Sequence, residues 1–186
     1  MGGRVIPFFT ESNIARAQPK TWESVEVASH VTGWIFLAAN FFAEFSVVTA
    51  VAAFCAAAVN GIRLWGWQVR RIRRIPIQWV LHLGYLWIVV GFVLSGLSAL
   101  GLVAPALAVH AYTVGGIGMV SYGMISRVSL GHTGRRLRAS FSTVIGYVLL
   151  LLSGVVRVFG PLLNPMFHDA AVVISGVLWM SAFGIF

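Results

Sequence analysis

The chain has 186 residues, of which 59% are hydrophobic and only 10% are charged, and its formal net charge is +8. Soluble domains are close to one quarter charged, so the composition excludes an ordinary soluble domain and predicts an all-α membrane helix bundle. The positive charge does not indicate binding to nucleic acid, because the arginines flank apolar runs, where anionic lipid headgroups account for them.

An amphipathic lead at residues 1–21, whose aromatic side chains suit a membrane interface, precedes six apolar runs. Each run is long enough to cross a hydrocarbon core of about 30 Å as a helix. Because Cys55 is the single cysteine, an internal disulfide is excluded. Its position within the second run predicts a packed thiol. The predicted bundle covers residues 22–186, with spans at about 22–41, 44–64, 77–100, 105–127, 139–159 and 169–186.

Twelve of the thirteen basic residues can be placed on one side of the membrane. They precede the first span, separate the second from the third, and separate the fourth from the fifth. Because loops rich in Arg and Lys stay in the cytoplasm, both chain termini are predicted to be cytoplasmic. The twelve are Arg4, Arg16, Lys20, Arg63, Arg70, Arg71, Arg73, Arg74, Arg127, Arg135, Arg136 and Arg138.

The histidines are the residues that most strongly suggest a function. Ionisable groups inside a membrane are costly and usually mark functional sites, and histidine is the commonest metal ligand. The alternative is that a neutral histidine only forms a hydrogen bond between packed helices. The five histidines are His30, His82, His110, His132 and His168.

The depths of these histidines restrict how they can act together. His82 is expected about 7–8 Å from the cytoplasmic edge, and His110 equally far from the outer edge, so the two cannot easily bind one iron. His30 matches His82 in depth and lies four residues from Glu26, which predicts a hydrogen bond that orients His30. His110 and His168 are both expected near the outer face.

Arginines at the cytoplasmic face suit the propionates of a b-type haem, because guanidinium groups form charge-assisted bonds to carboxylates. A haem on His82 would lie one or two helical turns from Arg127 and from the arginines of residues 70–74. The alternative is that these arginines only set the topology and bind lipid. The predicted loop at 131–135, which contains His132 and Arg135, could approach a cofactor or bind an anion through its backbone N–H groups.

Three stretches of the sequence resemble the NnrS family of membrane proteins: Gly2–Thr10, Trp79–Trp87 and His110–Arg135. The resemblance implies a multi-pass protein of the bacterial inner (cytoplasmic) membrane that binds haem and copper. It also implies a link to denitrification, to the nitric oxide response and to protection against nitrosative stress. Family members are about twice this long, so the chain resembles a carboxy-terminal half, and the missing amino-terminal half is an expected partner.

The resemblance implies that His82, His110 and His132 are candidate metal ligands. His30 is a further candidate on its expected depth alone. Arg127 and Arg135 lie within the matching stretch and are candidates for cofactor binding. We therefore predict a protein that binds haem b and copper and takes nitric oxide as a ligand, with no catalytic residue assigned. The alternative is a helical bundle without metal that acts as a structural or partner subunit or as a small-solute transporter.

Overall fold

The computed structural model describes residues 2–13, 18–43, 46–67, 72 and 74–186. All regular structure in these residues is helical, which confirms the predicted fold class. The elements are α1 (Gly2–Asn13), α2 (Glu23–Phe42), α3 (Val47–Gly66), α4 (Pro76–Ala99), α5 (Pro105–His110), the π-helical η1 (Ala111–Ile117), α6 (Gly118–His132), α7 (Phe141–Leu163), the 3₁₀ turn η2 (Pro165–Phe167) and α8 (His168–Gly184).

Five helical segments are long and apolar enough to cross a membrane: α2, α3, α4, α7 and the stretch Pro165–Gly184. A sixth long helix runs through α5, η1 and α6 without leaving helical conformation, and its π-helical turns divide it into shorter pieces. We call it the α5–α6 helix. The prediction of about six spans therefore agrees with the structure.

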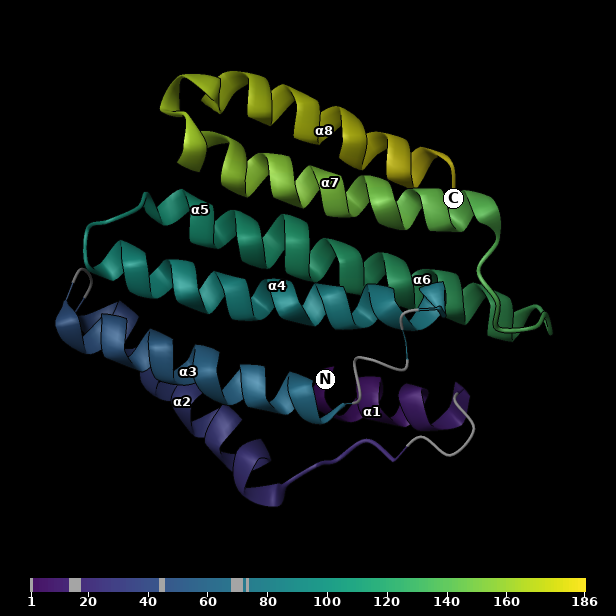
Figure 1. Cartoon of the computed structure of the whole chain (residues 1–186), viewed down its shortest axis with the longest axis horizontal. Helices are drawn as coiled ribbons and strands as arrows, with labels where there is room; N and C mark the ends of the chain where they lie inside the picture. Colours follow the sequence, from purple (N-terminus) through teal and green to yellow (C-terminus); the bar gives the residue numbers. More distant parts are fainter. Residues whose placement is uncertain (1, 14–17, 44–45, 68–71, 73) are drawn as a thin grey trace.

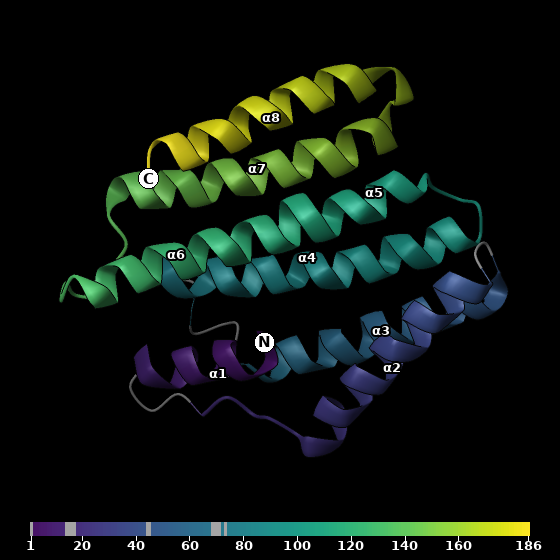
Figure 2. The same cartoon turned by 180° about the vertical axis from the view of Figure 1, so that it is seen from behind.

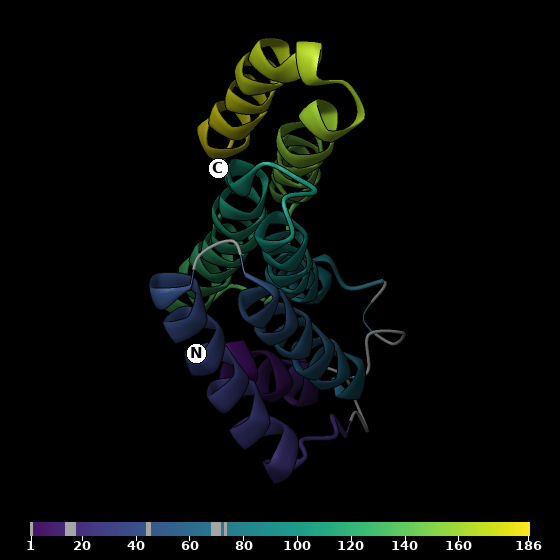
Figure 3. The same ribbon diagram turned by 90° about the vertical axis from the view of Figure 1, so that its left-hand side faces the viewer.

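The long helices run side by side and alternate in direction along the chain (Figures 1 and 2). Seen from the end of the bundle, they follow one another from α8 and α7 through the α5–α6 helix and α4 to α3 and α2 (Figure 3). Arg74 and the exposed arginines of 135–138 lie at the end where α4 begins and α6 ends. We call this the basic end, and we call the other the opposite end.

The core is centred on α4, which packs against α3, the α5–α6 helix and α1. Glycines allow the close approach, because the Tyr112 ring lies against Gly91 and the Trp87 ring lies against Gly115, where a Cβ atom would collide with them. The helices at the two edges, α2 and α8, leave most of their apolar side chains exposed. Such a surface suits lipid rather than water.

Hydroxyl side chains and prolines set the helix starts. Ser46 and Ser140 accept hydrogen bonds from the backbone N–H groups of Thr49 and Thr143 at the starts of α3 and α7. Proline opens α4 and α5, where the missing N–H of the first turn costs nothing.

Helix α1, which belongs to the predicted amphipathic lead, packs against α4 and buries Ile6 and Thr10. Two local expectations prove wrong. Helix α6 continues to His132, so Gly131 and His132 belong to a helix rather than to a loop. Cys55 is exposed on the outside of α3 instead of packed in the core.

Candidate functional site

The buried histidine His82 lies in the second turn of α4, near the basic end, and is only 3% exposed. Its Nδ1 atom lies 3.0 Å from the backbone carbonyl oxygen of Gln78. Because a carbonyl oxygen only accepts hydrogen bonds, Nδ1 carries the proton and Nε2 carries a lone pair. A histidine fixed in this tautomer is the neutral form that ligates a metal through Nε2.

The Nε2 atom of His82 is buried and has no hydrogen-bond partner within the described residues. The Trp67 ring packs edge-on against the imidazole, with centroids 6.2 Å apart, and the Trp67 backbone also lies near the imidazole without the geometry of a hydrogen bond. Three more buried polar atoms without partners lie at the basic end: Trp67 Nε1, Gln78 Oε1 and Arg127 Nη1. Buried polar atoms are rarely left unpaired, so these four atoms make the basic end a candidate binding site.

A groove of about 470 Å³ runs beside His82 between α3, α4 and α7. Its walls are apolar, and His82 is the one titratable side chain among the described residues that line it. A groove of this size and composition suits a large, mostly apolar ligand that carries a metal ion. The lining residues are Leu64, Ile72, Trp79, His82, Leu83, Leu86, Val148 and Leu151.

Arg127 is buried at the basic end under α1. Its guanidinium carbon lies 3.7 Å from the centre of the Phe9 ring, and Gln78 donates a hydrogen bond from Nε2 to the Phe9 carbonyl oxygen. The amino-terminal helix thus covers both Arg127 and the turn of α4 that holds His82. Of the other arginines expected near a haem, Arg74 is exposed, whereas Arg70, Arg71 and Arg73 lie outside the described residues.

The structure does not bring His132 and Arg135 to this groove. His132 ends α6 and is exposed, and Arg135 is exposed in the loop that follows. Gly134, in the loop after α6, has a positive φ of 64°. His132 and Arg135 therefore remain candidates for cofactor binding on the sequence resemblance alone.

His30 does not line the His82 groove. The hydrogen bond expected between Glu26 and His30 does form, but it uses the backbone carbonyl oxygen of Glu26, 2.7 Å from His30 Nδ1. His30 is exposed and lines a different cavity, of about 940 Å³, with Arg4 and Arg63.

The Glu26 carboxylate instead pairs with Arg63, which corrects the expectation that Arg63 only sets topology or binds lipid. Arg63 is buried, and its Nε donates to Glu26 at 2.6 Å. Its Nη1 donates to the hydroxyl groups of Ser29 and Tyr85, each at 3.1 Å. Ser29 and Tyr85 in turn donate to Asn60. This network joins α2, α3 and α4.

This network was not predicted from the sequence, although the sequence contains a signal for it. Glu26 and Ser29 are three residues apart on one helix, and Asn60 and Arg63 are three apart on the next. Residues at that spacing share a helix face, so two polar faces could have been paired.

The family assignment follows from comparison with protein-family models, one of which, described as NnrS protein, matches residues 1–186. The chain belongs to the NnrS family. Comparison with the curated proteins and with the solved structures finds no match. Membership of NnrS, together with the apolar helices, makes this a membrane protein related to the nitric oxide response.

NnrS proteins are known for binding haem and copper, so the His82 groove can be tested against a haem. The buried, unpaired Nε2 atom and the apolar walls fit that group. Copper has less support, because no group of three His, Cys, Asp or Glu side chains within metal-binding reach occurs in the described part of the chain.

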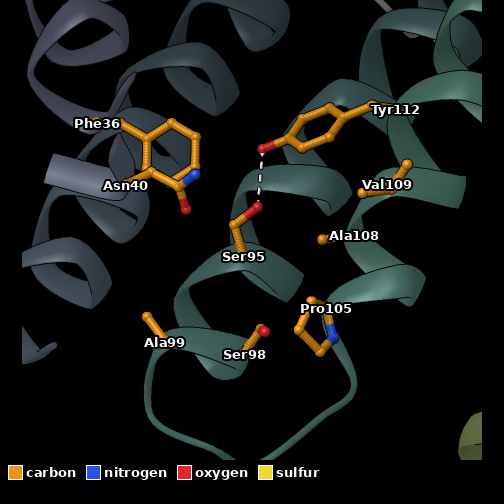
Figure 4. A pocket seen from close by; sticks show the side chains of 9 residues that line it. All are labelled: Phe36, Asn40, Ser95, Ser98, Ala99, Pro105, Ala108, Val109 and Tyr112. Atoms are coloured by element: carbon orange, nitrogen blue, oxygen red, sulfur yellow. Dashed lines mark hydrogen bonds between the residues drawn. The ribbon is translucent and has the colours of Figure 1, made fainter. Parts of the chain in front are cut away.

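His110 lies at the opposite end, in a cavity of its own with His168, as the depth argument predicts. Beside it, a polar cavity of about 260 Å³ lies between α2, α4 and the α5–α6 helix (Figure 4). The Tyr112 hydroxyl points toward the Ser95 hydroxyl across 3.2 Å, and Asn40 faces them from α2. These neutral groups can hold water or a small polar solute.

Proposed function

We propose that this NnrS chain binds haem b through His82 and acts in the nitric oxide response of a bacterial inner membrane, linked to denitrification and to resistance against nitrosative stress. The observation that supports it most directly is the state of His82. Its Nδ1 is engaged by a backbone carbonyl oxygen, and its Nε2 is buried without a partner beside an apolar groove.

His82 would hold the haem iron through Nε2, and Arg127 would hold a propionate through its unpaired Nη1. The groove walls from α3, α4 and α7 would exclude water from the bound group. A bound haem iron would supply a place for nitric oxide to bind or a route for electrons, and the polarity around it decides which. Copper binding and a second, amino-terminal membrane half remain predictions for this chain.

The test is the optical spectrum of the purified full chain after loading with haem. We expect about one haem per chain and a Soret band typical of histidine ligation. His82→Gly should lose this band, because the ligand atom is removed, and added imidazole should restore it by filling the vacated position. Rescue distinguishes a lost ligand from a damaged fold.

The matched control is His132→Gly, which removes an exposed histidine that does not line the His82 groove. It should keep the full haem content. The proposal is wrong if the wild-type chain takes up no haem, or if His82→Gly retains an unaltered Soret band. Either result would leave the bundle without metal as the better account.

A further inference from the structure

At the opposite end of the bundle, three side chains that can carry positive charge line one cavity of about 360 Å³. His110 comes from α5, Arg157 from α7 and His168 from the start of α8. Arg157 and His168 are close enough to His110 to act on it electrostatically. The other lining residues are apolar or proline.

Arg157 is the exception to the charge asymmetry of the chain, because the other described basic residues lie toward the basic end. It is six residues from the end of α7, or about 9 Å along the helix axis. Within the described residues Arg157 makes no ion pair and no hydrogen bond. Asp169, the acidic residue described at this end, is exposed and does not line the cavity.

We propose that this cavity binds a phosphate group, held by Arg157 with His110 and His168 as additional hydrogen-bond donors. Arginine inside a membrane normally pairs with an acid or with a carbonyl oxygen, and Arg157 has neither among the described residues. Its planar guanidinium matches two phosphate oxygens at once. The phosphate can belong to a phospholipid headgroup or to a free ion, since the recognition chemistry is the same.

The composition favours an anion over a metal ion at the two histidines. A cation held by His110 and His168 would lie beside the positive charge of Arg157, in a cavity whose described lining contains no acidic side chain. A phosphate group is attracted by the same charge and can accept hydrogen bonds from both imidazoles. The arginine therefore decides between the two kinds of ligand.

The first measurement is equilibrium dialysis of radiolabelled inorganic phosphate against the full chain after removal of lipid, at constant ionic strength in chloride. We expect one phosphate per chain. Arg157→Gln should weaken binding about ten- to hundredfold, as expected for loss of charge-assisted hydrogen bonds, and Arg157→Lys should weaken it less. The matched control Arg138→Gln, at an exposed arginine of the basic end, should not change it.

A second variant guards against misfolding. His168→Gln alters an exposed residue at the start of α8, so the fold should persist while phosphate binding weakens several-fold. Haem content should not change in any of these variants, because the cavity lies at the other end from His82. Failure of this proposal is thereby distinguishable from failure of the haem proposal.

The source of the phosphate is settled by competition in lipid nanodiscs. If inorganic phosphate no longer binds in nanodiscs of either phosphatidylglycerol or phosphatidylcholine, the site takes a headgroup phosphate. If inorganic phosphate still binds in both, the site takes a free ion. Equal phosphate binding by the wild type and Arg157→Gln, no binding by the lipid-free chain, or one equivalent of copper that is lost in His168→Gln would overturn the proposal.

Discussion

Removal of the Glu26 carboxylate should be the most damaging single polar change in the amino-terminal half of the bundle. Glu26→Gln leaves the Arg63 guanidinium buried without its counter-charge. Breaking a fully buried pair in this way costs about 3–5 kcal/mol. The side chains are 9% and 26% exposed, so part of the charge is screened, and we expect a loss of about 2–3 kcal/mol in the free energy of unfolding.

The measurement is unfolding of the purified protein in mixed micelles, followed by tryptophan fluorescence and helical circular dichroism. Glu23→Gln is the matched control, because Glu23 is exposed and lies in the same first turn of α2. It loses only the interaction with the helix dipole, about 0.3–1 kcal/mol. In Arg63→Met, addition of Glu26→Gln should cost little. The reasoning fails if Glu26→Gln and Glu23→Gln destabilise the protein equally, or if Glu26→Gln costs as much in the Arg63→Met background as in the wild type.

Three further predictions concern glycines and use the same unfolding assay: Gly3 and Gly91 are closely packed, and Gly33 is not. Gly3→Ala places a Cβ atom against the Arg63 guanidinium and should cost about 1–2 kcal/mol through weakened hydrogen bonds. Gly33→Ala, on an open face of α2, should instead stabilise the helix by about 0.5–1 kcal/mol. Gly91→Ala forces the Tyr112 ring outward and should cost about 1–3 kcal/mol, with loss of the packing between α4 and η1. Equal effects of Gly3→Ala and Gly33→Ala would contradict the packing of α1 on this network.

The membrane-spanning helices were predictable because their signal is local. Length and hydropathy of a run such as 141–163 decide whether it can span a bilayer, and no tertiary contact is needed. The π-helical turns at Ala111–Ile117 were not predictable in this way. They lie where Trp87 and Tyr112 pack between α4 and the α5–α6 helix, and a local stretch of sequence does not show such contacts.

The partners of charged side chains were harder to predict because they depend on which helices meet. Arg63, in α3, was counted with the arginines that set topology, although it pairs with Glu26 on the neighbouring helix α2. The spacing of Glu26 and His30 suggested an orienting hydrogen bond, which exists but leaves the carboxylate free for Arg63. The ends of the bundle at which His82 and His110 lie were easier to predict, because the depth of a residue follows from its position in the helix alone.

The unpaired polar atoms at the basic end are unusual, because buried hydroxyl groups elsewhere in the bundle have hydrogen-bond partners. Tyr122 donates to the Ala182 carbonyl oxygen at 3.0 Å, and Ser153 donates to the Ser175 carbonyl oxygen at 2.8 Å. Since unsatisfied polar groups cost several kcal/mol in a membrane interior, such pairing is the rule there. The buried side-chain atoms that break this rule in the described residues all lie around the first turns of α4 and the end of α6, where His82 and Arg127 are. This contrast supports the proposal that His82 holds a haem at the basic end, with Arg127 Nη1 as a candidate partner for a propionate.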